Sequence, residues 1–131
     1  MKKLLTIFCI LILSACSKEV PYGKLVIREG IYYEVNSRTP FTGIAYDDFS
    51  SNPNMGYEET NFKNGVKHGD QTKYFPNGQL SMESTFRNGC SVGALTYWYR
   101  NGQKSAVYRN DDKCNRHGLT QQWDMDGNIT E

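Results

Sequence analysis

The sequence contains no apolar run that is long enough to cross a membrane as a helix. A helix that spans the bilayer needs roughly 20 predominantly apolar residues. The longest such run here is residues 4–13, which reaches about half of a ~30 Å hydrocarbon core at about 1.5 Å rise per residue. The apolar run is therefore too short to form a stable transmembrane helix.

The chain also lacks an excess of charge of either sign. It carries 15 basic and 14 acidic residues, so its formal net charge is +1 at pH 7. Proteins that bind nucleic acid or anionic lipid through charge alone present a strongly basic surface. The near balance gives no electrostatic reason to expect nucleic acid as a partner.

Signatures of catalysis and of metal binding are missing as well. The sequence has no GxSxG, Walker, HExxH or dinucleotide fingerprint, and no CxxC spacing. His68 and His117 each follow a basic residue and precede a glycine, which indicates a recurring structural position. Asp124 and Asp126 have the first spacing of a calcium loop without its later ligands, so a turn is expected there. We predict a non-catalytic protein that uses no metal and no cofactor.

The first residues have the order of charge, apolar run and small residues that is typical of an export signal. Lys2 and Lys3 precede the apolar run, and residues 13–16 read LSAC. This tetrapeptide resembles the lipobox of bacterial lipoproteins, which implies removal of residues 1–15 and acylation of Cys16. The alternative is an ordinary secretory signal that leaves a free Cys16 thiol.

The lipoprotein resemblance also implies where the mature chain is held. Several acyl chains anchor a protein stably, because each buried methylene contributes about 0.8 kcal/mol. Ser17 follows the acylated cysteine, and in Gram-negative lipoproteins the absence of aspartate there implies transport to the outer membrane. We expect residues 16–24 to form a short tether, with the lipid bilayer as one partner through acylated Cys16.

The rest of the chain, residues 25–131, contains a repeat of about 24 residues. The units begin near Gly43, Gly69, Gly93 and Gly118. Asn-Gly and Asp-Gly pairs inside the units tolerate the positive φ angles of a tight type I′ turn. These turns are expected at 77–78, 101–102 and 126–127, and a second, looser turn at 64–65, 88–89 and 110–111.

Between the turn signals, β-branched and aromatic residues alternate with a period of 2. This alternation places Tyr74, Trp98 and Trp123 on one face, where we expect them to pack as the core. The whole pattern predicts an all-β fold, an antiparallel meander of repeated β-hairpins. Such units bury little surface alone and gain their core from their neighbours.

These repeats resemble a known family. The order of glycine, strand, aromatic pair, Asn-Gly, strand and Lys/Arg-Asn-Gly is similar to the bacterial variant of the MORN repeat (membrane occupation and recognition nexus). Residues 28–33 and 40–43 resemble the opening of the YwqK-type antitoxin family, which is built from these repeats. The resemblance covers about residues 25–131 and implies a MORN-like repeat sheet or solenoid and an antitoxin-like role.

Two cysteines remain in the expected mature domain, because Cys9 leaves with the signal and Cys16 carries lipid. Cys90 and Cys114 meet an oxidising compartment after export, which favours a disulfide. Equivalent points in successive hairpins lie about 9.6 Å apart, beyond the ~7 Å Cα limit for bridging. The loose connection 110–117 offers enough chain to close that gap. Two separate thiols are the alternative.

A second aromatic set has a use in binding. The alternation directs Phe75, Tyr97 and Tyr99 to the face opposite the expected core. Exposed aromatic rings on a rigid sheet supply a large contact area at low entropic cost. Packing is the alternative role for these three residues.

The expected function is therefore a membrane-anchored, non-catalytic protein-binding module of the cell envelope. Its partner is a toxin or an envelope protein, and an antitoxin or immunity role is the sharper form of the hypothesis. The alternative is a structural or adaptor lipoprotein that organises other envelope proteins. A neighbouring gene for a toxin-like protein would favour the first.

Overall fold

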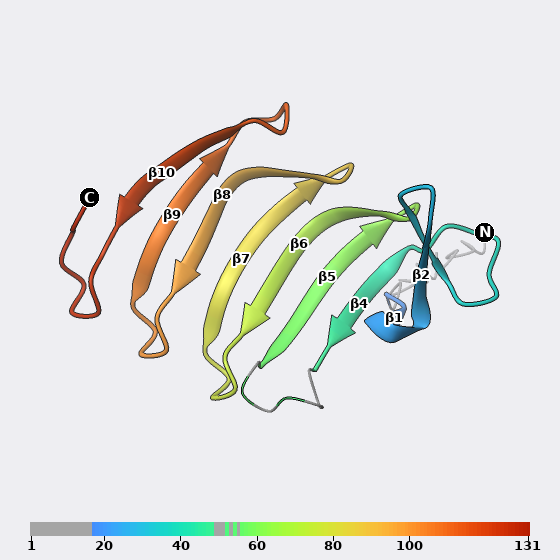
Figure 1. Ribbon diagram of the computed structural model, residues 1–131, viewed down its shortest axis with the longest axis horizontal. Helices are drawn as coiled ribbons and strands as arrows, with labels where there is room; N and C mark the ends of the chain where they lie inside the picture. The colour runs from blue at the N-terminus through green and yellow to red at the C-terminus, as the bar shows by residue number, and fades with distance from the viewer. Residues whose placement is uncertain (1–16, 49–51, 53, 55) are drawn as a thin grey trace, which may run out of the picture.

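The fold is built almost entirely from β-strands. The computed structural model describes residues 17–48, 52, 54 and 56–131, so the predicted signal peptide and Cys16 lie outside the described residues. Within them, one large sheet has the strand order β1-β4-β5-β6-β7-β8-β9-β10 (Figure 1). These strands are β1 (Glu19–Pro21), β4 (Gly43–Asp47), β5 (Tyr57–Lys63), β6 (Val66–Tyr74), β7 (Leu80–Arg87), β8 (Cys90–Trp98), β9 (Lys104–Asn110) and β10 (Arg116–Gln122).

Strands β4 to β10 lie in chain order, and each pairs antiparallel with the next. The prediction of an all-β chain with a mostly antiparallel sheet is confirmed. The connections between consecutive strands are short, because antiparallel neighbours can be joined by a few turn residues.

The first strand corrects the predicted tether. Strand β1 pairs in parallel with β4, with Glu19 opposite Ile44, and the N–H of Ile44 donates to the carbonyl of Lys18 at 2.8 Å. Val20 in the middle of β1 is only 7% exposed. The folded domain therefore begins by Lys18, and residues 19–24 do not form part of a tether. The sequence concealed this strand because three residues are too few to show a period.

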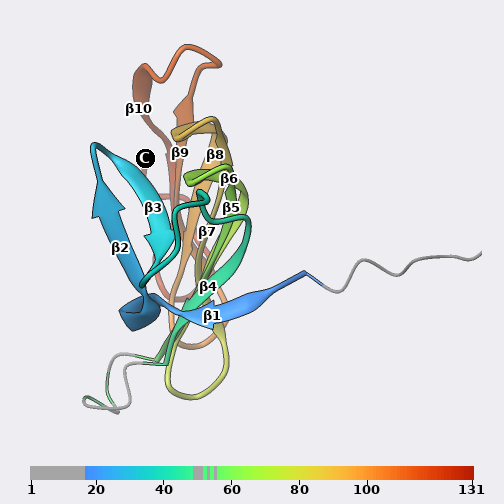
Figure 2. The same cartoon turned by 90° about the vertical axis from the view of Figure 1, so that its right-hand side faces the viewer.

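A small hairpin covers one side of the sheet. The 3-10 helix η1 (Tyr22–Lys24) leads into β2 (Leu25–Arg28) and β3 (Ile31–Glu34), which pair antiparallel. In the edge-on view this hairpin stands on one side of the large sheet (Figure 2). The buried hydrophobic cluster comprises Val20, Phe41, Ala45 and Phe62.

Aromatic rings pack the hairpin onto the sheet. The ring centroids of Tyr32 and Phe62 lie 4.8 Å apart, and Phe41 packs against Phe62 at 5.8 Å. Burial raises the pKa of Tyr22 to about 12, because the charged phenolate is disfavoured away from water. This end of the molecule is a two-layered structure with a hydrophobic core.

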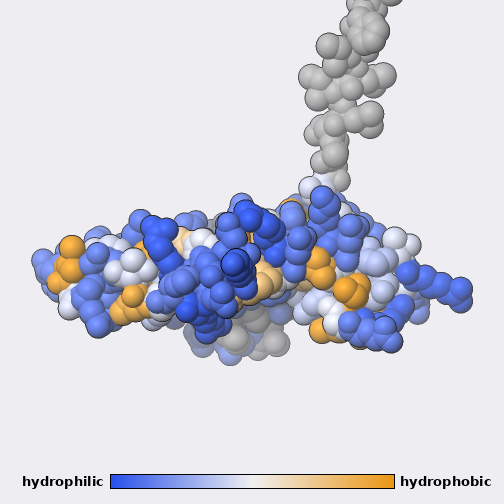
Figure 3. Space-filling model, turned by 90° about the horizontal axis from the view of Figure 1, so that it is seen from above, coloured by the Kyte–Doolittle hydropathy of each residue, from blue (hydrophilic) through white to orange (hydrophobic). Residues whose placement is uncertain are grey.

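The residues that were predicted to form the core lie outside the buried hydrophobic cluster. Tyr74, Trp98 and Trp123 are half-buried, and none belongs to the buried cluster, so that prediction is wrong. Viewed from above, hydrophobic residues appear as small patches among hydrophilic ones (Figure 3). Beyond the hairpin the buried positions are mostly small or polar side chains, namely Gln71, Ser84 and Thr96, together with Met82 and Val92.

The tight turns lie at the connections that were expected to be loose. At Asn64-Gly65 and Asn88-Gly89 both residues have positive φ, from 50° to 85°. The flanking residues pair directly, so each connection is a two-residue loop. Positive φ at both positions defines a type I′ turn.

The turns at the other ends of the strands have a different form. In residues 75–79 the N–H of Gly78 donates to the carbonyl of Phe75, and only Gly78 has a positive φ, 82°. Gly102 occupies the same place in residues 99–103, with φ 86°. This pattern is a type I turn followed by a glycine bulge. The prediction of type I′ turns there is wrong, although both glycines do need the left-handed region.

Candidate binding face

Two rows of cross-strand neighbours run across β7 to β10. In the first row Tyr97 of β8 lies opposite Met82 of β7 and Ala106 of β9. In the second row Tyr108 of β9 lies opposite Leu95 of β8 and Leu119 of β10. Residues directly opposite one another share a face, and so do residues two apart on a strand. Both rows therefore lie on one side of the sheet, which we call the open face. Its residues are Met82, Leu95, Tyr97, Ala106, Tyr108 and Leu119.

The open face continues the side that the hairpin covers. Met82 lies opposite Lys73, which lies opposite Glu58 of β5. Two residues along β5, Thr60 lies opposite Ala45 of the buried cluster. One side of the sheet is therefore covered at β4 and β5, and no described element covers it at β8 to β10.

The aromatic residues of the open face remain accessible. Tyr97 is 38% exposed, Tyr108 37% and Leu119 36%. The rings of Tyr97 and Tyr108 meet edge to face with centroids 6.0 Å apart, an arrangement that aromatic pairs prefer. The pair thus holds two rigid rings at the surface.

A hollow lies on each side of this tyrosine pair. The first, of about 330 Å³, is lined by Leu95, both tyrosines and Arg116 among others. The second, of about 470 Å³, lies toward β6 and β7 and is lined by both tyrosines, Lys73 and Met82 among others. Together they form a shallow surface that suits contact with another chain.

The two sides of the sheet differ in charge. The open face includes no acidic side chain, and Glu58, further along its first row, is bound by Lys73 at 2.9 Å. A hollow on the opposite side of the same strands is lined by Asp70, Glu83 and Asp112 among others. The open face is therefore apolar with basic flanks, whereas the hollow on the opposite side holds three carboxylates and Arg87.

The structure separates the three predicted binding residues. Tyr97 lies at the centre of the open face, and Phe75 lines its second hollow with Arg100 over its ring at 5.5 Å. The Tyr99 hydroxyl donates to the carbonyl of Trp123 at 2.9 Å, so Tyr99 links neighbouring hairpins. Sequence reasoning missed Tyr108 and Leu119, because their place on the open face depends on cross-strand pairing that contains bulges.

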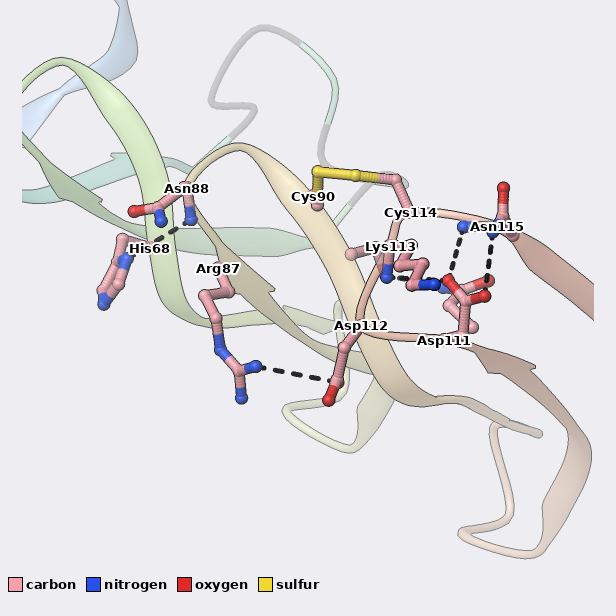
Figure 4. The surroundings of a disulfide bond; sticks show 11 residues. His68, Arg87, Asn88, Cys90, Asp111, Asp112, Lys113, Cys114 and Asn115 are labelled. Atoms are coloured by element: carbon pink, nitrogen blue, oxygen red, sulfur yellow. Dashed lines mark hydrogen bonds and ion pairs between the residues drawn. A yellow bond between two sulfur atoms is a disulfide. The ribbon is translucent and has the colours of Figure 1, made fainter.

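Cys90 and Cys114 are joined by a disulfide in the structure, with Cα atoms 5.2 Å apart (Figure 4). Gly93 of β8 lies opposite Asn110 at the end of β9. Cys90 precedes Gly93 on the same strand, so it lies beside the turn that follows β9. Cys114 in that turn has a positive φ of 69°. The loop thus reaches the neighbouring strand directly, instead of bridging equivalent points two strands apart.

The turn that holds Cys114 is organised by one carboxylate. Asp111 accepts hydrogen bonds from the backbone N–H of Lys113 and from the backbone and side-chain N–H groups of Asn115. The bonds from Asn115 contribute most to lowering the pKa of Asp111 to about 2. Asp124 bonds Asn128 in the same way, which explains the Asp124–Asp126 spacing as a turn.

The histidines have structural contacts. His68 Nδ1 accepts the backbone N–H of Asn88 at 3.3 Å, and His117 Nε2 lies 3.4 Å from Asp111. Among the described residues, no group of His, Cys, Asp and Glu side chains is arranged to hold a metal ion. The described part of the chain also has no helix that is long and apolar enough to cross a membrane.

Comparisons of the chain with protein families, curated proteins and solved structures give no match.

Proposed function

We propose that this protein is a membrane-anchored lipoprotein of the cell envelope that binds a protein partner through the open face and catalyses no reaction. The observation that carries the proposal is the exposed pair of Tyr97 and Tyr108, set among aliphatic side chains on a sheet. Clustered aromatic residues on a rigid support are typical of interaction surfaces.

Recurring contacts between hairpins support the proposal of a MORN-like repeat array. The Asn77 side chain donates to the carbonyl of Arg100, and the Asn101 side chain donates to the carbonyl of Met125. Each turn is thus tied to the next by the same contact. Repeat arrays gain their rigidity from such nearest-neighbour contacts and offer extended binding surfaces.

Anchoring follows from the proposed acylation of Cys16. Because β1 begins at Glu19, only Ser17 and Lys18 separate the lipid-bearing residue from the sheet. The domain would therefore be held close to the membrane, on the outer membrane by the lipoprotein resemblance. Growth with a fatty-acid probe should label the wild type and leave Cys16→Ser unlabelled and released from membranes. A labelled Cys16→Ser protein would contradict the lipoprotein proposal.

Binding is tested by chemical crosslinking in the native envelope. Tyr97→Ser combined with Tyr108→Ser should remove the crosslinked partner, because it removes both rings of the open face. The matched control is Tyr57→Ser combined with Tyr74→Ser, a pair of neighbouring rings with centroids 6.1 Å apart on the opposite side of the sheet. Loss of the partner in the control variant alone would show that the partner binds the side opposite the open face, which would contradict the proposal.

The identity of the captured protein separates the two forms of the proposal. A co-encoded toxin whose activity falls when it binds this chain would establish the antitoxin or immunity form. A non-toxic envelope component would establish the structural or adaptor form.

A further inference from the structure

We propose, on the basis of the proposed function, that the open face accepts an extended acidic segment of its partner, with apolar residues over the tyrosines and a carboxylate against Arg116. This partner chemistry follows from the distribution of charge on the sheet and from the position of one arginine.

Arg116 is available to a ligand. It lines the hollow beside Tyr97 and Tyr108 and is exposed. Within the described residues no Asp or Glu side chain forms an ion pair with it, unlike Arg87, which faces Asp112 at 3.7 Å. An arginine guanidinium presents a fork of donors that matches a carboxylate.

The rest of the open face favours the same ligand. An acidic segment meets no carboxylate on the six residues of this face, whereas the opposite side presents Asp70, Glu83 and Asp112. Lys73, at the other end of the face, already forms an ion pair with Glu58. The preference for an acidic ligand is therefore strongest at Arg116. Complementary charge of this kind selects between partners more than it raises affinity.

The dimensions fit a short extended chain. From Lys73 on β6 to Leu119 on β10 the surface crosses four strand spacings, about 19 Å at ~4.8 Å each. An extended chain advances about 3.3 Å per residue, so about six residues cover this distance. The apolar part of the segment would cross the Tyr97 and Tyr108 rings between its two ends.

Three fluorescent peptides of about eight residues test the inference by anisotropy titration. One carries Phe residues in its middle and Asp residues at its two ends, and the others replace Asp by Lys or by Ser. The Asp/Phe peptide should bind the folded domain most tightly, and the Lys/Phe peptide least. Higher salt should weaken only the Asp/Phe peptide, because screening reduces exposed charge contacts.

Two charge reversals locate the contact. Arg116→Glu should weaken the Asp/Phe peptide about tenfold, because it replaces attraction by repulsion. Arg109→Glu is the matched control, since Arg109 lies opposite Ala94 and therefore on the other side of the sheet. It should leave binding within about twofold of the wild type. Thermal melting of both variants verifies that each is folded.

Each contrary outcome has a distinct meaning. Equal affinity for the Asp/Phe and Lys/Phe peptides, equal effects of the two reversals, or no binding of any peptide would overturn the acidic assignment. Binding of the Ser/Phe peptide that needs both tyrosines but ignores charge would overturn this inference and leave the open face intact. The envelope crosslinking experiment fails or succeeds independently of these peptides.

Discussion

The two ends of this sheet are stabilised by different means. At β4 and β5 the hairpin closes over the sheet, and Phe41, Ala45 and Phe62 are at most 3% exposed. At β8 to β10 no described element forms a second layer, and the strands are held by backbone ladders, side-chain links between turns and one disulfide. The same face of the sheet is therefore packed under a second layer at one end and exposed at the other.

The largest expected effect is at the covered end. Phe62→Ala should lower the free energy of unfolding by about 3 to 5 kcal/mol, because it opens a cavity among packed aromatic rings. Tyr108→Ala on the open face should cost no more than about 1 kcal/mol, since its ring is already partly solvated. Urea unfolding of both variants measures the difference. Equal losses would show that the open end has a core of its own.

The disulfide should have the next largest effect. Cys90→Ser combined with Cys114→Ser should cost roughly 3 kcal/mol by the chain-entropy estimate for a loop of this length. Hydrogen exchange should rise mainly in β8 to β10 and little in β4 and β5. Mass spectrometry of non-reduced peptides from the native envelope should find the two cysteines linked. Two alkylatable thiols in that protein would contradict the bridge.

The glycines of the turns provide a smaller effect. Gly78→Val should cost about 1 to 3 kcal/mol, because a β-branched residue is strained at φ 82°. Gly102→Val should cost about as much, since its added Cβ would meet only the movable end of the Gln79 side chain, at 2.9 Å, and nothing lies within 4 Å at Gly78. Melting temperatures measure both. Melting within a degree or two of the wild type would refute the assigned turn conformation.

The smallest expected effect is on stability at acidic pH, through the carboxylate of Asp111. The pKa of Asp111 is lowered to about 2 from its usual value of 3.8, with the hydrogen bonds from Asn115 as the main cause. A lowered pKa in the folded state means that this stabilisation is complete above about pH 4 and is lost as the pH falls toward 2. Asp111→Asn should flatten that part of the stability curve without changing stability loss at alkaline pH. An unchanged acid limb would show that Asp111 contributes nothing there.

Sequence periodicity was sufficient for the general architecture and insufficient for its details. Alternation and Asn-Gly signals predicted strands and turns, but they could not tell a type I′ turn from a type I turn with a bulge, because Asn-Gly suits both. The core was misplaced onto Tyr74, Trp98 and Trp123 because the second layer comes from β2 and β3, whose packing partners lie far along the chain.

The candidate site was partly accessible from sequence. Tyr97 was identified because it alternates with the expected core positions. Tyr108 and Leu119 were missed, since their place on the open face depends on the pairing of β8, β9 and β10 and on bulges that shift the register. Availability of Arg116 depends on which carboxylates lie near it, and only the folded chain determines that.

Photo-crosslinking in the native envelope, from adjacent positions of β9, tests the central claim most directly. A photoreactive aromatic residue replaces Tyr108 in one protein and Arg109 in the other, so that the two probes face opposite sides of the same strand. Our account predicts a crosslinked partner from position 108 and none from position 109. A partner captured only from position 109, or equally from both positions, would contradict binding through the open face.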